Sequence, residues 1–233
     1  MAELSPMMKQ YFETKKKYPD TILMFRLGDF YEMFFDDAVT VSRELELVLT
    51  GRACGQEERA PMCGVPFHSA DSYMARLVAK GYKVAICEQM EDPALAKGLV
   101  KREVVRVLTP GTVIENSMLN EGRNNFLASV YFAGESAGVC FVDVSTGSVN
   151  LTELASPAVS DKIINEIGRF MPSEIVFNSA SSSLTKVFSF ISNKTEALAQ
   201  ELGDSYFDPR QSAETILAHF KKDSLSELEL HEG

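Results

Sequence analysis

Hydrophobic residues in the first half of the chain follow two different periods, and this pattern predicts both strands and helices. An unbroken apolar run over 21–27 predicts a buried strand, and residues 30–35 predict a second strand with one exposed face. Further strands are expected at 82–89 and 103–108, and helices at 5–17, 37–49 and 69–81. Strands that alternate with helices are typical of an α/β layer.

Local signals set the predicted ends of these elements. Ser5 followed by Pro6 indicates a helix start, because serine caps free N–H groups and proline suits the first turn. The lysines at 15–17 fall in the last turn of that helix, where we expect them to be solvated. Gly51 is expected to end the second helix, and the polar residues 51–61 are expected to form a loop.

The second half of the chain has a different order of elements. Three strand-like runs joined by short turns predict an antiparallel meander over 126–154. A helix is expected at 160–170, a strand at 174–177, a serine-rich loop at 179–183 and a helix at 212–220. This order resembles a ribonuclease-H-like fold.

We therefore expect an α/β protein with two domains. Pro110 and Gly111 break the strand pattern, and the stretch from there to Asn125 is polar and has no strong period. The predicted first domain is a mixed α/β domain at 1–109, followed by a linker at 110–125. The predicted second domain is the ribonuclease-H-like part at 126–233, which we expect to be incomplete at its carboxyl end.

The stretch 28–34, Gly-Asp-Phe-Tyr-Glu-Met-Phe, contains the most unusual combination of side chains. In a strand Phe30, Glu32 and Phe34 share one face, while Tyr31, Met33 and Phe35 share the other. An aromatic cluster after an apolar strand is usually part of a core. A carboxylate between two phenylalanines is unfavourable in a core unless it is paired. One face is therefore expected to pack and the other to meet a ligand.

These residues match the G-x-F-Y-E-x-F motif of the MutS family of DNA mismatch-recognition proteins. The resemblance is close over residues 5 to about 150 and weak beyond them. Further matching blocks follow in the family's order: Asp36-Asp37-Ala38, Leu49-Thr50-Gly51-Arg52, Pro61-Met62-Cys63-Gly64-Val65-Pro66-Phe67-His68, Val84-Ala85-Ile86-Cys87-Glu88-Gln89 and Val107-Leu108-Thr109-Pro110-Gly111-Thr112.

The resemblance implies a role for three residues. Phe30 corresponds to the phenylalanine that wedges beside a mispaired base, and Glu32 to the glutamate that hydrogen-bonds this base. Arg52 matches a basic position that touches the DNA backbone, although a solvated arginine is an equally good interpretation. Neighbouring phosphates and desolvation favour the protonated form of a carboxyl group, so a protonated Glu32 could donate to a base nitrogen.

The resemblance also implies partners and cofactors. Mismatched duplex DNA is the expected ligand of the first domain, and the second domain, the family's connector, is expected to dock a MutL-type partner. ATP and Mg²⁺ bind in family domains that lie beyond this chain, and no G-x-x-x-x-G-K-[ST] loop is present here. We expect a non-enzymatic chain with no cofactor or metal of its own. The full-length family protein is a homodimer, whereas this chain alone is expected to be a monomer.

The charge distribution limits the expected DNA affinity. The net charge of the 233 residues is −10, which by itself argues against nucleic-acid binding. Residues 1–112 have 15 basic and 16 acidic side chains, whereas residues 113–233 have 8 and 17. The first half is therefore nearly neutral. It is expected to bind DNA weakly, because phosphate contacts supply most non-specific affinity.

Cysteine usage and hydropathy indicate a cytoplasmic protein. The four cysteines have no C-x-x-C spacing, which predicts free thiols in a reducing compartment and no structural zinc. No apolar run approaches the roughly 20 residues that span a bilayer, and no secretory signal is visible at the start.

Two other functions are compatible with the pattern. A ribonuclease-H-like sheet can place acidic residues around two metal ions, and Asp143, Asp161 and Glu166 are the candidates for a metal-dependent nuclease. The predicted strand at 126–132 has no acid, which weakens this reading. Alternatively, the acidic second half is a protein-interaction module, since it has no site that can be recognised from its sequence.

Overall fold

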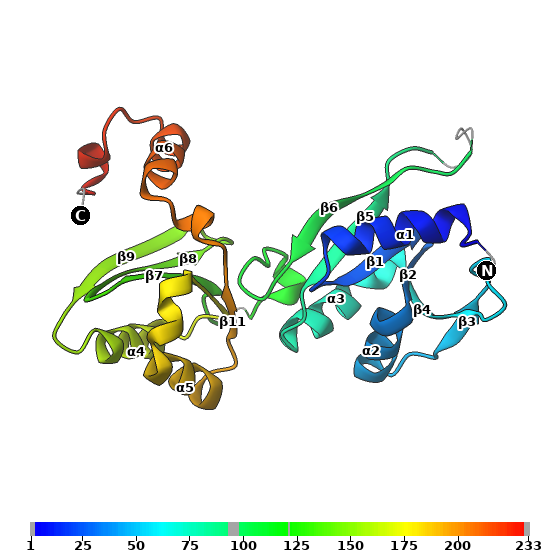
Figure 1. Cartoon of the computed structure of the whole chain (residues 1–233), viewed down its shortest axis with the longest axis horizontal. Coiled ribbons are helices and arrows are strands. Elements are labelled where there is room, and N and C mark those ends of the chain that lie inside the picture. Colours follow the sequence, from blue (N-terminus) through cyan, green and yellow to red (C-terminus); the bar gives the residue numbers. More distant parts are fainter. Residues whose placement is uncertain (1–2, 93–97, 121, 231–233) are drawn as a thin grey trace. The chain divides into compact units, whose positions relative to one another are not determined.

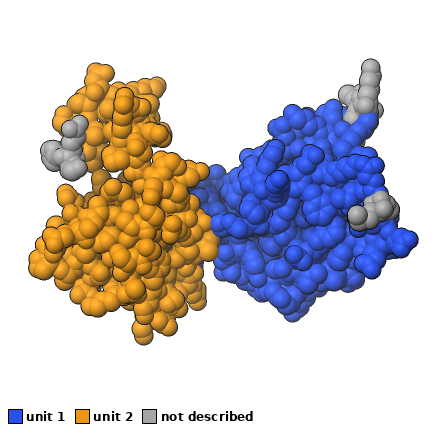
Figure 2. Space-filling view, viewed as in Figure 1, with its two compact units in different colours: residues 1–125, 144–146 blue, residues 126–143, 147–233 orange. Residues whose placement is uncertain are grey.

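The computed structural model describes residues 3–92, 98–120 and 122–230. It contains two compact units, one of residues 1–125 with 144–146 and the other of residues 126–143 with 147–233 (Figures 1 and 2). Each unit has its own sheet and its own hydrophobic core.

The first unit is built on a six-stranded mixed sheet in the order β3-β4-β2-β1-β5-β6. Strands β1 and β5 are parallel, and the other neighbours are antiparallel. Its elements are α1 (Pro6–Lys17), β1 (Ile22–Leu27), β2 (Phe30–Phe34), α2 (Phe35–Leu45), β3 (Thr50–Arg52), β4 (Ala60–Pro66), α3 (Ala70–Ala79), β5 (Val84–Gln89) and β6 (Arg102–Leu108).

Helices cover both faces of this sheet (Figure 1). Helix α1 packs Met8 and Tyr11 against the face that contains Phe25 and Phe34. Helices α2 and α3 pack against the opposite face, and their apolar residues join Met33 and its neighbours in the larger core of the unit. Helices on both faces of a mixed sheet confirm the predicted mixed α/β class.

The start of α1 is formed by the predicted signals. The Ser5 hydroxyl accepts a hydrogen bond from the Met8 N–H at 3.4 Å, and Pro6 occupies the first turn. The strands predicted at 21–27 and 30–35 are also present as β1 and β2. Capping chemistry and the apolar period therefore predicted the framework of the unit correctly.

Three local predictions for the first unit are wrong. Helix α2 ends at Leu45 rather than at residue 49, because Glu46 adopts a left-handed conformation with φ 58°. Gly51 lies in strand β3 instead of ending a helix, and the predicted loop 51–61 contains most of β3 and the start of β4. Phe34 was expected on the ligand-binding face together with Phe30, but it is fully buried under α1 with its ring 5.1 Å from that of Tyr11.

The segment 110–125, predicted as a linker, contains residues that pack on the first unit. Val113 is buried in the larger core, and Met118 and Leu119 pack against it. The Asn125 amide donates to the Pro110 carbonyl at 2.8 Å. The boundary between the two units falls between residues 125 and 126.

The second unit has a five-stranded sheet in the order β11-β10-β7-β8-β9. Its elements are β7 (Phe126–Ala133), β8 (Ser136–Asp143), β9 (Ser148–Ala155), α4 (Val159–Phe170), β10 (Glu174–Phe177), α5 (Thr185–Lys194), β11 (Leu198–Glu201) and α6 (Pro209–Phe220). The first three strands form the predicted antiparallel meander, and β10 and β11 add in parallel. Helix α5 and strand β11 were not predicted.

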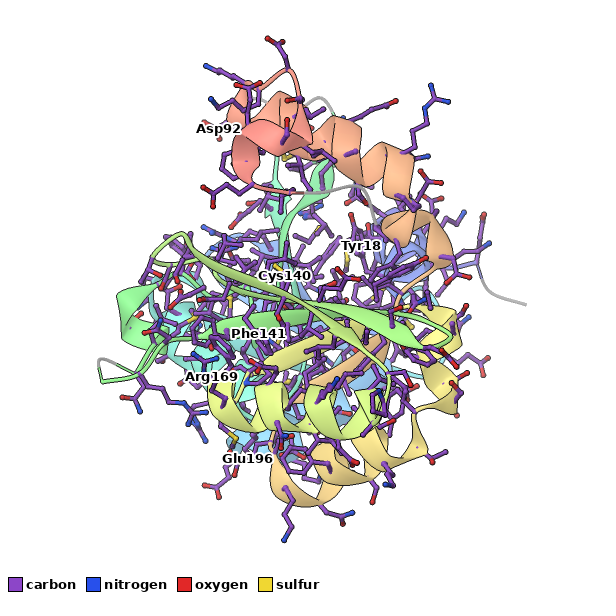
Figure 3. The ribbon with its side chains drawn as sticks, turned by 90° about the vertical axis from the view of Figure 1, so that its left-hand side faces the viewer. Tyr18, Asp92, Cys140, Phe141, Arg169 and Glu196 are labelled. Carbon is purple, nitrogen blue, oxygen red and sulfur yellow. The ribbon has the colours of Figure 1, made fainter. Side chains whose placement is uncertain are left out.

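Helices α4 and α5 cover one face of this sheet through Ile163, Ile167, Val187 and Ile191. Successive residues of β8 point to opposite faces, so Phe141 stacks on Phe170 of α4 with a centroid distance of 4.1 Å, whereas Cys140 lies on the outer face (Figure 3). Three antiparallel strands followed by helical crossovers to two parallel strands agree with the predicted fold of the second domain.

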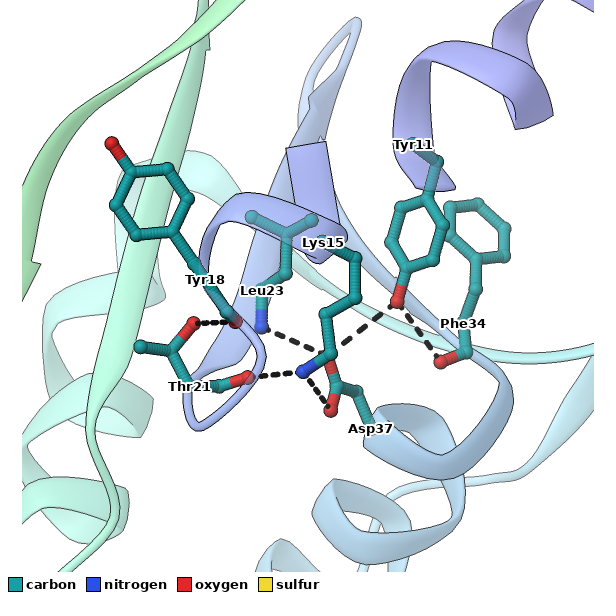
Figure 4. A network of polar contacts seen from close by, with 7 residues as sticks. All are labelled: Tyr11, Lys15, Tyr18, Thr21, Leu23, Phe34 and Asp37. Carbon is teal, nitrogen blue, oxygen red and sulfur yellow. Dashed lines mark hydrogen bonds and ion pairs between the residues drawn. The ribbon is translucent and has the colours of Figure 1, made fainter. Parts of the chain in front are cut away.

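A buried carboxylate joins three elements of the first unit (Figure 4). Asp37, which is only 7% exposed, accepts hydrogen bonds from the Leu23 N–H at 3.0 Å and the Tyr11 hydroxyl at 3.5 Å. Its other oxygen lies 2.9 Å from the Lys15 ammonium, which also donates to the Thr21 carbonyl. Lys15 was expected to be solvated, and this expectation is wrong because its ammonium neutralises Asp37.

Burial, and next the charge of Asp37, raise the pKa of Tyr11 above its ordinary value. The Tyr11 hydroxyl therefore stays protonated and remains a donor to both Asp37 and the Phe34 carbonyl. Through these bonds Asp37 fixes the junction of α1, β1 and α2 at the end of strand β2.

Replacing Asp37 by alanine is expected to destabilise the first unit by about 3 kcal/mol, because the buried Leu23 N–H and the partly buried Lys15 ammonium lose this acceptor. Asp36→Ala is the matched control, since this neighbouring acid is exposed. Tyrosine fluorescence during urea unfolding measures the effect, because most tyrosines lie in residues 1–125. Equal midpoints for the two variants would contradict the assigned role of Asp37.

Candidate nucleic-acid interface

Phe30 begins strand β2 directly after a tight turn. Strands β1 and β2 form a hairpin in which Leu27 pairs with Phe30, so only Gly28 and Asp29 make the connection. Two-residue hairpin turns need left-handed backbone, and Gly28 supplies it with φ 58°. On the other side Phe30 pairs with Pro66 of β4, and this places its backbone between two strands.

Phe30 is 46% exposed, although Tyr31, Met33 and Phe34 of the same strand are buried. Phe34 lies on the same face, four residues further on, and α1 covers it completely. This face is therefore closed at the Phe34 end of β2 and open at the Phe30 end.

Glu32 lies on this face between the two phenylalanines. Its side chain is 13% exposed, and its cross-strand neighbour in β4 is Gly64. A Cβ atom at Gly64 would lie 3.2 Å from the Tyr31 carbonyl oxygen and 3.4 Å from the Cγ atom of Glu32. Glycine at this position therefore leaves room for the Glu32 side chain along the sheet surface.

The carboxylate of Glu32 forms an ion pair with the Arg52 guanidinium. Arg52 is the last residue of β3 and pairs with Ala60 of β4. The loop that follows is anchored to the start of the chain, where the Ser5 N–H donates to the Cys54 carbonyl at 2.8 Å. Any side chain at Gly55 would collide with the Glu3 carbonyl oxygen, which lies 2.5 Å from the position of its Cβ atom. Arg52 is thus held at one place beside Glu32.

The three residues proposed from the sequence therefore lie together: Glu32 contacts Arg52, and Phe30 is two residues away on the same strand face. Their assignment to DNA remains a prediction at this point. Of the three, only Phe30 is strongly exposed, and the two charged residues neutralise each other in the structure without DNA.

Arg102 is a further cation on this face, and no local sequence pattern indicated its burial. Its guanidinium is buried and donates to the carbonyls of Arg26 at 2.7 Å and Val100 at 2.9 Å, and to the Gln10 side chain at 3.0 Å. It also lies over the ring of Phe25, 5.2 Å from the centroid. Burial, together with the nearby charge of Arg52, lowers the pKa of Arg102.

Two other basic residues, one just before β6 and one in it, are paired within the chain. Lys101 lies 2.7 Å from Glu103, and Arg106 forms an ion pair with Glu115. These pairs are not visible as a pattern in the sequence, because their partners come from the same strand or from the segment after it.

The described part of the chain contains no group of three or more histidine, cysteine and acidic side chains arranged as metal ligands. Asp143, Asp161 and Glu166 are accordingly not gathered into such a group, so the geometry gives no support to the nuclease alternative.

The four cysteines are free thiols, and burial raises the pKa of Cys63 to about 11 and that of Cys87 to about 12. No helix in the described ranges is long and apolar enough to cross a membrane.

Comparison with known families agrees with this geometry. The model of MutS domain I matches residues 5–117, and the model of MutS domain II matches residues 125–233. The two matches follow the two compact units and define a mismatch-recognition domain followed by a connector domain. The chain belongs to the MutS family.

Curated relatives named DNA mismatch repair protein MutS match most of the chain. The protein of Lachnoclostridium phytofermentans is 50% identical over 230 residues, which are 99% of this chain and 24% of the relative. The protein of Acetivibrio thermocellus is 52% identical over 221 residues, 95% of this chain and 25% of the relative. That of Clostridioides difficile is 59% identical over 178 residues, 76% of this chain and 18% of the relative.

The chain thus spans about a quarter of the length of these relatives. It contains domains I and II of the family, and the family's ATPase domain is not present in it.

Proposed function

We propose that the first unit recognises mispaired or unpaired bases in duplex DNA by inserting the ring of Phe30 beside the base and hydrogen-bonding it with Glu32. The observation that carries this proposal is the exposed Phe30 ring, on a short turn, next to a carboxylate on the same strand face. The membership of the family supports it, and Arg52 is assigned to the DNA backbone.

The energetics of stacking explain how one ring can discriminate. Unstacking and kinking a well-paired base step costs a few kcal/mol, and a mispair costs less because part of its stacking and pairing is already lost. An aromatic side chain stacked on a base returns roughly 1–3 kcal/mol. Because the two magnitudes are similar, insertion is unfavourable in a good duplex and favourable in a loose one. Discrimination then comes from deformability rather than from the base sequence.

The ion pair between Glu32 and Arg52 gives both residues a second state. A DNA phosphate can replace Glu32 as the partner of Arg52, since a guanidinium binds phosphate in the same forked geometry as a carboxylate. Glu32 is then released beside the inserted ring. The phosphates around it favour a protonated carboxyl group, which can donate a hydrogen bond to a base nitrogen.

Replacing Phe30 by alanine is expected to remove the preference for mispaired DNA and to leave the fold intact, because the ring is exposed and its loss opens no cavity. The test is a titration of the chain on a G·T duplex and on its matched counterpart at low salt. Phe12→Ala is the control, since Phe12 is a similarly exposed aromatic residue, at 41%, on helix α1. A preference that survives in Phe30→Ala excludes this residue as the wedge.

Replacing Glu32 by glutamine is expected to keep or increase the affinity for both duplexes and to reduce the ratio between them. The amide removes a charge that phosphates repel, yet it can no longer respond to its surroundings by taking up a proton. Glu44→Gln is the matched control, because Glu44 is also a partly buried, ion-paired glutamate in the first unit. An unchanged ratio of dissociation constants in Glu32→Gln would refute the hydrogen-bonding role.

We further infer, from the family relationship, that the second unit docks a MutL-type partner. Supporting this, strand β9 forms the edge of the described sheet, and Val149 and Leu151 on it are strongly exposed. ATP, Mg²⁺ and dimerisation are assigned to the parts of the longer relatives that lie outside this chain, which we propose acts as a non-enzymatic monomer in the cytoplasm.

Capture of a purified MutL-type protein by the immobilised 233-residue chain would test the docking role. We expect Leu151→Glu to weaken this capture, because it places a charge in the exposed apolar strip, and the exposed Glu153→Lys to serve as the control. Capture that is equal for all three proteins would place the docking surface elsewhere, and no capture by any of them would remove the proposal.

A further inference from the structure

We propose that Arg26 is a positioning residue that holds the Gly28-Asp29 turn rigid while Phe30 is inserted into DNA. This inference rests on the proposed function of Phe30. Arg26 acts together with three residues on the sheet face opposite to the Phe30 ring. We name the group Arg26, Tyr31, Phe67 and Glu88 the turn clamp.

Arg26 contacts the turn directly. It lies on β1 two residues before Gly28, and its Nε atom donates to the Gly28 carbonyl at 2.5 Å. Its side chain pairs across the ladder with Tyr31, so it occupies the face covered by α2 and α3, while Leu27 and Phe30 point to the other face. The turn is thereby held from behind, and nothing in this group covers the exposed ring.

A second bond joins the turn to β4. The Phe67 N–H donates to the Asp29 carbonyl at 2.9 Å, immediately after the end of that strand. The Phe67 ring lies flat under the Arg26 guanidinium, with 3.7 Å between the guanidinium carbon and the ring centroid. Arg26 and Phe67 each form a hydrogen bond with the turn, and this cation–π contact connects the two residues.

Glu88 and Tyr31 fix the guanidinium from the other side. Glu88, on β5, lies 3.6 Å from an Arg26 nitrogen and accepts a hydrogen bond from the Tyr31 hydroxyl. Burial first, and then the bond to Glu88, raise the pKa of Tyr31, so its hydroxyl remains a donor. Each member of the turn clamp therefore touches at least one other member, and two of them bond to the turn.

Rigidity of this turn matters because of where the cost of insertion falls. When a ring is inserted between bases, the bases exert a force on the ring and so on the backbone that holds it. Phe30 directly follows the Gly28-Asp29 turn, so this force acts on the turn. If the turn is flexible, the turn moves instead of the DNA, at matched and mispaired base steps alike. The affinity then no longer depends on how easily the base step is deformed. A rigid turn transfers the distortion to the DNA, where a mispair gives way more easily.

The first test is the ratio of the dissociation constants for a matched and a G·T duplex, measured with the 233-residue chain at low salt. We expect this ratio to fall about tenfold in Arg26→Met, which corresponds to ~1.4 kcal/mol. Arg26→Lys should lower it as well, because an ammonium cannot both stack on Phe67 and bond the turn. Arg43→Met, which removes an exposed cation on α2, is the control for the loss of one charge.

The second test needs no DNA. Amide hydrogen exchange at Phe67 reports on its bond to Asp29, and we expect it to be at least several-fold faster in Arg26→Met than in Arg43→Met. Phe67→Leu removes only an exposed ring, so it tests the clamp even if Arg26→Met does not fold. We expect a reduced duplex ratio in Phe67→Leu too.

The outcomes separate this inference from the proposed function. If Phe30→Ala abolishes the preference and the Arg26 and Phe67 variants keep it, the turn clamp is refuted and the wedge stands. If Arg26→Met weakens both duplexes equally while Arg26→Lys restores them, Arg26 is a phosphate contact and not a positioning residue. Unchanged exchange at Phe67 in Arg26→Met overturns the clamp whatever the DNA data show, whereas a preference that survives Phe30→Ala overturns the wedge itself.

Discussion

The buried carboxylate of Asp37 is the interaction on which the first unit most depends. It stands in the first turn of α2, at the place where β2 ends, and it binds the backbone of β1 and two side chains of α1. A buried charge is tolerated only when it is paired and hydrogen-bonded, so these partners must all be in place together. Asp37 thereby sets the position of α1 on the sheet, and α1 decides which residues of β2 are covered.

The consequence is a strand that is buried at one end and open at the other. Phe34 lies against Tyr11, next to the Asp37 network, while Phe30, at the far end of the same face, is 46% exposed. Glu32 lies between them. Its carboxylate is buried enough to need a charged partner, and its partner Arg52 is exposed enough to exchange Glu32 for another anion. The candidate site is therefore the exposed end of the same sheet face that α1 covers at its other end.

Much of this could be predicted from the sequence, and the failures have identifiable physical causes. The period of two over 30–34 and the Ser5-Pro6 start depend on neighbours in the chain, and both were predicted correctly. Strand β3 and the start of β4 were predicted as a loop because residues 51–61 are polar and charged, and only the pairing of β3 with β4 and of β4 with β2 makes them strands. The burial of Arg102 and the pair of Glu32 with Arg52 join different strands, so no local pattern reports them. The roles of Phe30 and Glu32 came from the family motif, because alternation alone placed the buried Phe34 on the same face as these two residues.

The distribution of charge is compatible with the proposed recognition of a deformable base step in DNA. Several cations of the first unit already have partners inside the protein, since Arg52 is paired with Glu32, Lys101 with Glu103 and Lys15 with Asp37. In the proposed function, phosphates would first have to replace these partners, and we therefore expect the general attraction to any duplex to be small. When the electrostatic attraction common to every duplex is weak, the small difference between a stiff and a loose base step makes up a larger share of the total free energy of binding. A strongly basic surface would add the same favourable energy to every duplex and would hold the protein on matched DNA, where there is nothing to recognise.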